Sequence, residues 1–327
     1  MHHPLKHHQV LLGFAACFLL PWGAMAQGTA LVSSEKDNAL TIVNLKDQKV
    51  QGVIATCKRP RHLQLTPDGK QVLVACAGDN AADVIDVASR KSVGRIPLGD
   101  APEAFDISPD GKTLYVSNED EGELGFVDIA SKKIVKEVKV GKEPEGVRVS
   151  ADGKTVYVTS EVASMVHVID TASAKVLKNI AVGKRPRRMA LTPDGAELWV
   201  TNELGASVSI ISTKDMKVIG TVKFALKGAK ASDITPVGIV ISKDGKRAFV
   251  GLGRANHVAF VDVATRETTQ QVLAGKRAWN LALNRDESQL YVVNGLSDDM
   301  TVVDVASAKA VKTIPVGRVP YGAVLID

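Results

Sequence analysis

Residues 141–182 read GKEPEGVRVSADGKTVYVTSEVASMVHVIDTASAKVLKNIAV, and this segment is one copy of a unit that repeats along the whole chain. Consecutive copies start 42 residues apart, except for one step of 50 residues. A proline stands three places after six of the seven starts, and an aspartate stands eleven places after the first six. A fixed period of this length indicates a repeat architecture. The starts are Cys57, Gly99, Gly141, Gly183, Asp233, Gly275 and Gly317.

Each copy contains four short runs in which apolar residues alternate and valine and isoleucine are frequent, a pattern typical of β-strands. In the quoted copy, residues 151–154 read ADGK and join the first two runs. There Asp152 can bond its own turn backbone, and Gly153 can adopt the positive φ that the turn needs. Asp170 ends the third run and can accept the next turn's backbone N–H. We therefore interpret these aspartates as structural.

A four-stranded unit of about 42 residues that repeats around a ring is typical of a propeller blade. The last copy retains only its first strand, GAVLID at residues 322–327, while residues 29–54 supply three strands that lack an inner partner. The sequence therefore predicts an all-β fold, a seven-bladed β-propeller in one domain over residues 27–327. Its C-terminal strand should join the N-terminal strands in one blade. We number the blades from 1, which starts at Cys57, to 7, which closes the ring.

Residues 1–26 have the pattern of a secretory signal peptide, with an apolar run over residues 10–20 and the small-residue pattern Ala24-Met25-Ala26 before Gln27. The apolar run is too short for a spanning helix, so no membrane span is expected. Lipid attachment at Cys17 is an alternative that Phe14 disfavours. Cleavage removes Lys6 and lowers the formal net charge from +5 to +4. We predict a periplasmic or secreted protein.

Cleavage leaves two cysteines, Cys57 and Cys76. An even number in an exported chain favours a disulfide, although the hairpin register does not place the two directly opposite each other. Neither belongs to a CxxC or CxxCH motif, so haem attachment and zinc binding have no support. The histidines of the mature chain are dispersed, and no metal site is predicted.

Four segments at the second strand of their blades resemble the YVTN repeat: LYVSN (114–118), VYVTS (156–160), LWVTN (198–202) and LYVVN (290–294). The resemblance covers the mature chain and implies the propeller fold. Within that family the chain is most similar to the group associated with catabolism that depends on pyrroloquinoline quinone (PQQ). This resemblance implies an accessory role in alcohol oxidation, PQQ as a possible ligand, and a periplasmic redox or transport protein as a possible partner.

The loops that lead into the first strand of each blade should share one face of the disc with the loops between strands two and three. We call the former the lead-in loops. Those of blades 6, 7 and 1 form a basic and aromatic arc, and the arginines of blade 4 face it across the ring. This suits an acidic small molecule, because a guanidinium binds a carboxylate with two hydrogen bonds. The eight extra residues lie in FALKGAKASD (224–233) and add Lys227 and Lys230 to this face. The candidate ligand-binding residues are Arg61, His62, Arg187, Arg188, Arg277, Trp279, Asn280, Arg318 and Tyr321.

Trp279 is the strongest single candidate for ligand stacking, because its position is polar in most other blades, whereas Trp199 occupies a core position of strand two. A purely structural interpretation of the arginines is also open. Glutamates in neighbouring loops can pair with the arginines and tie adjacent blades together. These glutamates are Glu35, Glu119, Glu161 and Glu203.

Two further function classes remain open. A propeller enzyme of the lactonase or lyase type could use carboxylates at the channel mouth, and the residues concerned are Glu103, Glu145, Glu161 and His62. No spacing singles them out, and the GxSxG, HExxH and P-loop motifs are missing, so a non-catalytic protein is favoured. Single-stranded nucleic acid is the other possibility, raised by GKRPRR (183–188). Acidic loops on the same face disfavour it. We expect a monomer.

Overall fold

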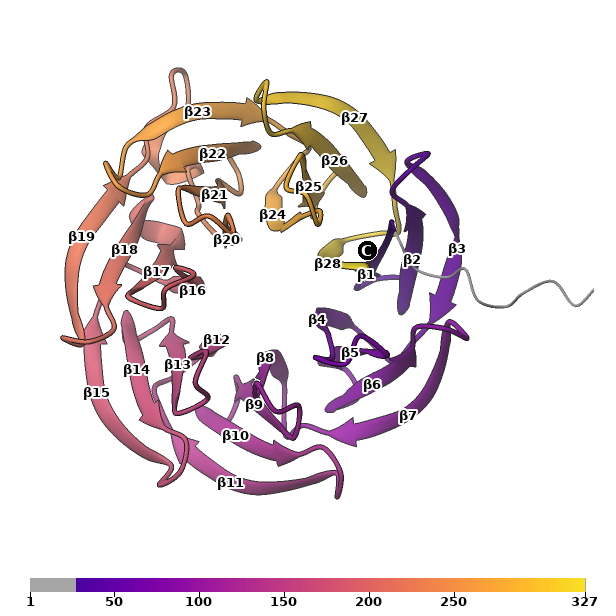
Figure 1. Ribbon diagram of the computed structural model, residues 1–327, viewed down its shortest axis with the longest axis vertical. Helices are drawn as coiled ribbons and strands as arrows, with labels where there is room; N and C mark the ends of the chain where they lie inside the picture. Colours follow the sequence, from indigo (N-terminus) through magenta and orange to yellow (C-terminus); the bar gives the residue numbers. More distant parts are fainter. Residues whose placement is uncertain (1–27, 327) are drawn as a thin grey trace, which may run out of the picture.

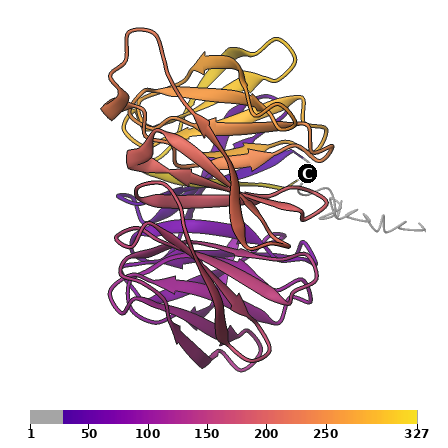
Figure 2. The same cartoon turned by 90° about the vertical axis from the view of Figure 1, so that its left-hand side faces the viewer.

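The computed structural model of the chain describes residues 28–326, in which seven four-stranded antiparallel sheets stand around a central axis (Figure 1). The predicted seven-bladed β-propeller is confirmed. Seen edge-on in Figure 2, the ring is a thick disc. The predicted signal peptide and its cleavage site before Gln27 lie outside the described residues. Within residues 28–326, no helix is long and apolar enough to cross a membrane.

The strands follow the same order in every blade, from the channel outwards, and neighbouring strands are hydrogen-bonded. The innermost strands are β4 (Pro60–Leu65), β8 (Pro102–Ile107), β12 (Pro144–Val149), β16 (Pro186–Leu191), β20 (Ile239–Ile241), β24 (Ala278–Leu283) and β28 (Pro320–Ile326). The second strands are β5 (Gln71–Cys76), β9 (Thr113–Asn118), β13 (Thr155–Ser160), β17 (Glu197–Asn202), β21 (Arg247–Gly251), β25 (Gln289–Asn294) and β1 (Thr29–Ser34).

The third strands are β6 (Ala81–Asp86), β10 (Glu123–Asp128), β14 (Met165–Asp170), β18 (Ser207–Ser212), β22 (His257–Asp262), β26 (Asp299–Asp304) and β2 (Ala39–Asn44). The outermost strands are β7 (Lys91–Pro97), β11 (Lys133–Lys139), β15 (Lys175–Ala181), β19 (Lys217–Lys223), β23 (Thr268–Leu273), β27 (Lys309–Pro315) and β3 (Lys49–Ala55). Two short 3₁₀ turns complete the described structure, η1 (Glu203–Gly205) and η2 (Ala231–Asp233).

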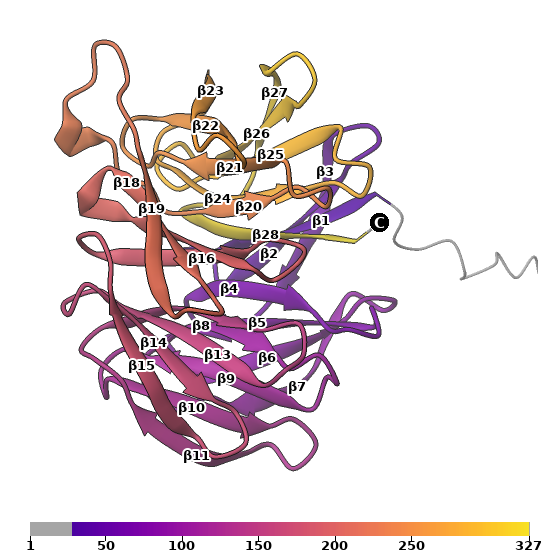
Figure 3. The same cartoon turned by 60° about the vertical axis from the view of Figure 1, so that its left-hand side comes forward.

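Blade 7 closes the ring as the repeat register predicts. Strand β28 pairs with β1, with Thr29 opposite Ile326 and Ala30 opposite Leu325. Figure 3 shows β28 between β24 and β4, the innermost strands of the two adjacent blades. The C-terminal strand therefore completes both a sheet and the lining of the channel.

The turn chemistry expected from the repeats is present. Asp68 accepts hydrogen bonds from the Thr66 hydroxyl at 2.6 Å and from the Lys70 backbone N–H at 3.1 Å. Asp86 accepts from both the backbone N–H and the hydroxyl of Ser89, at 2.7 and 2.6 Å. These bonds account for the aspartates without a functional role, because they satisfy the turn's own polar groups.

The hydrophobic core lies between the blades. Leu73 and Ala75 of blade 1 belong to one buried cluster with Phe105 and Val116 of blade 2. Trp199 is fully buried in the equivalent layer between blades 4 and 5, as its strand-two position predicts. Each fully buried side chain of this size stabilises the fold by about 1.5–3 kcal/mol. Burial therefore fixes the blades relative to one another and sets the position of every innermost strand.

Candidate functional site

The innermost strands place one residue of each blade at the same point of the channel. In six of the blades the pairing with the second strand shifts register between the third and sixth residues after the repeat start, for example between Pro60 and Leu63. Such a bulge redirects side chains locally. We define the channel ring as the residues four places after each start: Arg61, Glu103, Glu145, Arg187, Val237, Trp279 and Tyr321. Blades 1–4 contribute charged residues to this ring, and blades 5–7 contribute apolar or aromatic ones.

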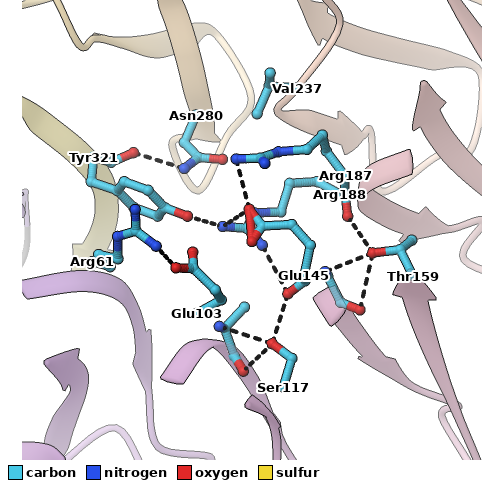
Figure 4. Close-up of polar contacts among 12 residues, drawn as sticks. Arg61, Glu103, Ser117, Glu145, Thr159, Arg187, Arg188, Val237, Asn280 and Tyr321 are labelled. Atoms are coloured by element: carbon cyan, nitrogen blue, oxygen red, sulfur yellow. Dashed lines mark hydrogen bonds and ion pairs between the residues drawn. The ribbon is translucent and has the colours of Figure 1, made fainter. Parts of the chain in front are cut away.

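Hydroxyl groups on the second strands hold the ring in place. Thr159 accepts a hydrogen bond from the Gly146 backbone N–H of its own blade at 2.7 Å and donates to the Arg187 carbonyl of the next blade at 2.9 Å. Ser117 makes the same link to the Glu145 carbonyl at 2.8 Å (Figure 4). Ser33 and Thr201 repeat it towards the carbonyls of Arg61 and Val237. Four ring residues are thus positioned by the preceding blade.

Arg187 is the centre of a buried network of ion pairs. Its guanidinium lies 2.8 Å from the Glu145 carboxylate, 3.7 Å from that of Glu203, and pairs closely with Glu161. Arg185 joins the same network through Glu161 at 2.6 Å and Glu203 at 3.2 Å. The predicted inter-blade ties between arginine and glutamate are therefore present, and those of Arg187 are buried rather than exposed.

A second network links blades 7, 1 and 2. Arg61 pairs with Glu103 of blade 2 and lies 3.6 Å from Glu35 of blade 7, which also pairs with Arg59 at 3.3 Å. Glu35 and Glu103 are thereby neutralised by the arginines of blade 1. The members of the two networks come from five consecutive blades of the ring: 7, 1, 2, 3 and 4.

The channel is also bridged across its diameter. Arg188 of blade 4 donates a hydrogen bond to the Tyr321 hydroxyl of blade 7, as Figure 4 shows. Tyr321 packs with Val237 and Trp279 in a small apolar cluster. The guanidinium of Arg61 lies 5.2 Å from the centre of the Tyr321 ring. Charged and apolar halves of the channel ring therefore meet at Tyr321.

A cavity of about 310 Å³ opens at this mouth of the channel. It is lined by Glu35, Arg59, Arg61, Glu103, Glu119, Glu145, Arg185, Arg187, Arg277, Trp279, Gly295, Val319, Pro320 and Tyr321. Nine of these residues are charged, and seven of the nine take part in ion pairs with one another or with a neighbouring carboxylate or guanidinium. The volume lies at the lower end of the range typical of small-molecule sites.

Arg277 and Glu119 are the two charged lining residues that form no ion pair within residues 28–326. The Arg277 guanidinium lies 3.9 Å from the centre of the Trp279 ring, close enough for a cation–π contact. Both side chains are only partly buried. The cavity therefore presents one uncommitted cation and one uncommitted carboxyl group.

The pKa values follow these differences in pairing. Burial opposes ionisation of Glu145, but Arg187 and Arg188 outweigh it and lower the pKa of that carboxyl. Burial, followed by the charge of Glu145, raises the pKa of Glu119. Loss of hydration also lowers the pKa of Arg277, which lacks the close carboxylate that offsets burial at Arg187. Burial also raises the pKa of Glu161 despite its arginine partners, so the two unpaired groups are identified by the missing ion pair, and their pKa shifts agree with it.

Five of the nine predicted ligand-binding residues line the cavity: Arg61, Arg187, Arg277, Trp279 and Tyr321. Trp279 differs from the prediction, since it is only 5% exposed and two guanidinium groups, those of Arg187 and Arg277, lie against its ring. Its face is therefore covered by the protein's own cations.

The other four predicted residues do not line the cavity. Arg188 is committed to Glu145 and Tyr321, and the Asn280 amide donates to the Tyr321 carbonyl at 2.7 Å. Arg318 is exposed and pairs with Asp37 at 2.6 Å. This ion pair was not predicted, because Asp37 does not occupy the repeat position of Glu35, Glu119, Glu161 and Glu203. Lys227 and Lys230 of the insertion also lie outside the cavity lining.

His62 packs edge-on against Phe105, with ring centres 4.9 Å apart. Loss of hydration, followed by the nearby charges of Arg188 and Arg148, lowers the pKa of His62 from 6.5 to about 3. The imidazole is therefore neutral at ordinary pH and adds no positive charge towards an anion.

Other predicted features have clear places in the structure. Cys57 and Cys76 form a buried disulfide with a Cα–Cα distance of 5.8 Å, which ties the lead-in loop of blade 1 to the end of β5. Among residues 28–326, no group of three or more His, Cys, Asp or Glu side chains is suited to a metal ion. The arginines of GKRPRR bind glutamates, so this segment does not present a free phosphate-binding patch.

The channel ring itself could have been recognised from the sequence. Its seven members share one repeat position, and the change from charged to apolar residues along that position is visible once the copies are aligned. Glu119 was expected to pair with an arginine, like Glu35, Glu161 and Glu203. That expectation is wrong for Glu119 alone. The sequence contains a reason, because the lead-in loops of its own blade and of the next, GDAPEA (99–104) and GKEPEG (141–146), have no arginine.

Comparison with protein families gives two partial matches. Residues 78–148 match the family described as YNCE-like beta-propeller, and residues 173–314 match the family described as Lactonase, 7-bladed beta-propeller. The chain is a β-propeller protein. No curated protein sequence matches this propeller.

Solved structures show the same fold over most of this propeller. Kuenenia stuttgartiensis hydrazine synthase is 25% identical with a TM-score of 0.77, and the match covers 86% of this chain and 94% of that chain. A functionally unknown protein from Desulfotomaculum acetoxidans is 17% identical with a TM-score of 0.79, covering 92% and 99%. Dihydro-heme d1 dehydrogenase NirN, in complex with DHE, is 17% identical with a TM-score of 0.69, covering 91% and 76%. The latter two likenesses concern the fold alone.

Proposed function

We propose that this propeller binds a small carboxylate-bearing molecule in the cavity at its channel mouth, and that Arg277 is the residue that binds the carboxylate. The observation that carries the proposal is that Arg277 is the one cavity-lining arginine without an ion pair among the described residues. Its guanidinium is held against Trp279 and is partly shielded from water. A carboxylate bound there would gain charge-assisted hydrogen bonds and would restore the stability of the charged arginine.

The other arginines make the cavity selective. Arg61, Arg185 and Arg187 already hold glutamates, so a ligand carboxylate would have to displace a buried carboxylate to reach them. Displacement leaves a buried charge without its partner, which is costly. PQQ carries several carboxylates and would meet one free guanidinium. PQQ therefore remains a proposed ligand. A molecule with a single carboxylate matches the one unpaired guanidinium better than PQQ does.

The resemblance to the PQQ-associated group supports a non-catalytic role beside PQQ-dependent alcohol oxidation, in the periplasm or outside the cell. We propose that residues 1–26 are removed on export. Mass spectrometry of the protein secreted by its host tests this, and an N-terminus other than Gln27 contradicts it.

Calorimetry of the purified protein tests the binding proposal. Caproate and PQQ are titrated into the wild type and into Arg277→Gln, with Arg318→Gln as the matched control, because Arg318 is an exposed arginine of a lead-in loop that does not line the cavity. We expect Arg277→Gln to weaken binding by about tenfold or more, and Arg318→Gln to leave it unchanged. Equal affinity in all three proteins, or no binding, refutes the proposal.

A docking site for an acidic protein is the second candidate. Four lead-in loops present an exposed lysine at the same repeat position, Lys58, Lys142, Lys184 and Lys276, and none of them forms an ion pair within residues 28–326. Such a ring of cations can steer an acidic partner to this face. Binding of a purified acidic cytochrome c that weakens with salt and is lost on changing the four lysines to glutamate supports this candidate. Binding that survives the change excludes it.

The lactonase alternative receives limited support. The lactonase family match spans residues 173–314, whereas Glu103, Glu145, Glu161 and His62 all lie outside that span. The three glutamates are paired with arginines. Steady hydrolysis of a lactone by the purified protein would nevertheless establish an enzyme, and a panel of lactones tests it directly.

A further inference from the structure

Two unpaired groups of opposite charge face the same cavity. Arg277 belongs to the lead-in loop of blade 6, and Glu119 follows β9 in blade 2. The innermost strands of these blades, β24 and β8, are separated in the ring by β28 and β4 (Figure 1). A molecule that contacts both groups must therefore extend across the mouth of the channel.

Backbone hydrogen bonds hold both residues in place. The Arg277 backbone N–H donates to the Asn256 side chain at 2.9 Å, and its carbonyl accepts from the Gly295 N–H at 3.0 Å. The Glu119 N–H donates to the Ala101 carbonyl at 3.1 Å. The two charges are thus presented from ordered loops, an arrangement that reduces the entropy lost on binding.

The charges around the cavity are balanced. Counting the lining residues together with their partners Glu161, Arg188 and Glu203, six arginines face six glutamates. An added anion would satisfy Arg277 but would leave Glu119 partly desolvated beside the negative charge of Glu145. An added zwitterion would satisfy both groups and keep the balance.

We infer that the ligand is a zwitterion of extended shape, an amino acid whose carboxylate binds Arg277 and whose ammonium group binds Glu119. This inference rests on the proposed carboxylate site and names the class of molecule that fills it. Blades 7 and 1 lie between the two charged groups, and their lining residues Tyr321 and Arg61 mark the part of the cavity that the middle of such a ligand would cross. An ammonium group at Glu119 would also favour the ionised carboxyl, whose pKa burial raises.

A series of ω-amino acids tests the inference by calorimetry. Glycine, γ-aminobutyric acid, ε-aminocaproic acid and ω-aminocaprylic acid present the same two charges at increasing separation. Caproic acid supplies the carboxylate alone, and hexylamine supplies the ammonium group alone. We expect one length to bind about tenfold or more tightly than caproic acid. We also expect glycine, which is too short to reach both groups, to bind more weakly than that optimal length.

Two variants test which residue binds each end of the ligand. Glu119→Gln should remove the advantage of the ω-amino acid over caproic acid. It should not weaken the binding of caproic acid, because it takes away a carboxyl group that disfavours an added anion. Arg277→Gln should weaken both ligands. Asp120→Asn is the matched control, because Asp120 is exposed on the same loop and does not line the cavity.

The outcomes separate the inference from the proposed function. If caproic acid binds as tightly as every ω-amino acid and depends on Arg277, the carboxylate site stands and the zwitterion inference is overturned. An optimal length that is unaffected by Glu119→Gln also overturns the inference. If no carboxylate binds at all, both proposals fail.

Discussion

Arg188 of blade 4 donates a hydrogen bond to the hydroxyl of Tyr321 in blade 7, and so joins two strands on opposite sides of the ring. Arg188 also lies 3.4 Å from Glu145, which fixes the guanidinium in the channel. Tyr321 is 3% exposed and packs against Val237 and Trp279. The propeller is therefore tied across its channel as well as from blade to blade.

Tyr321→Phe should lower the free energy of unfolding by about 1.5–3 kcal/mol, because it removes a buried hydrogen bond from a charged donor. Urea denaturation followed by circular dichroism measures the loss. Tyr157→Phe is the matched control: Tyr157 is also buried, but its hydroxyl makes no hydrogen bond within residues 28–326. Equal losses in the two variants would show that the bond across the channel contributes nothing specific.

Arg187→Met should be far more destabilising than Arg318→Met. Arg187 is 8% exposed and pairs with three glutamates, so its loss leaves buried carboxylates without a partner and should cost about 3–5 kcal/mol. Arg318 and Asp37 form an exposed pair whose loss should cost about 0–1 kcal/mol. The two variants are compared by urea denaturation at neutral pH. Similar values for both would contradict the assignment of Arg187 to a buried network.

His62 should make the protein sensitive to mild acid. Its pKa is about 3 in the folded chain, below its usual value of 6.5, so the unfolded chain binds more protons between these two pH values. The contribution of His62 to stability is therefore complete above about pH 6.5 and is lost as the pH falls towards 3. We expect His62→Gln to lose stability less steeply than the wild type over this range. Parallel curves of unfolding free energy against pH would exclude the effect.

The Cys57–Cys76 disulfide closes a loop with a sequence separation of 19 residues and should stabilise the fold by about 3 kcal/mol. The double variant Cys57→Ala, Cys76→Ala should show this loss in urea denaturation. Reduction with dithiothreitol should reproduce it in the wild type and have no effect on the double variant. Because the disulfide anchors the loop that carries Arg59 and Arg61, the variant should also bind cavity ligands more weakly. A wild type that is as stable reduced as oxidised would refute the prediction.

The fold was predictable because its determinants are local and repeated. Copies such as residues 141–182 carry their own strand pattern and turn residues, and seven copies define a closed ring. The register even placed β28 beside β1, since the position of each strand within a copy depends only on its distance from the repeat start. The candidate loops followed from the same register, and five of the nine residues proposed from them line the cavity.

The sequence shows which lead-in loops carry arginines, and those of blades 2 and 3 carry none, but the individual ion pairs were decided by the tertiary structure. Glu119 and Glu161 occupy the same repeat position, yet Glu161 binds Arg185 and Arg187 while Glu119 has no cationic partner within residues 28–326. Likewise Arg187 is buried among glutamates, and Arg277 is left to stack on Trp279. The sequence determined which residues reach the channel, because strand order and repeat register are properties of each copy. Which of those residues remain free for a ligand depends on distances between side chains of different blades, and only the closed, packed ring sets those distances.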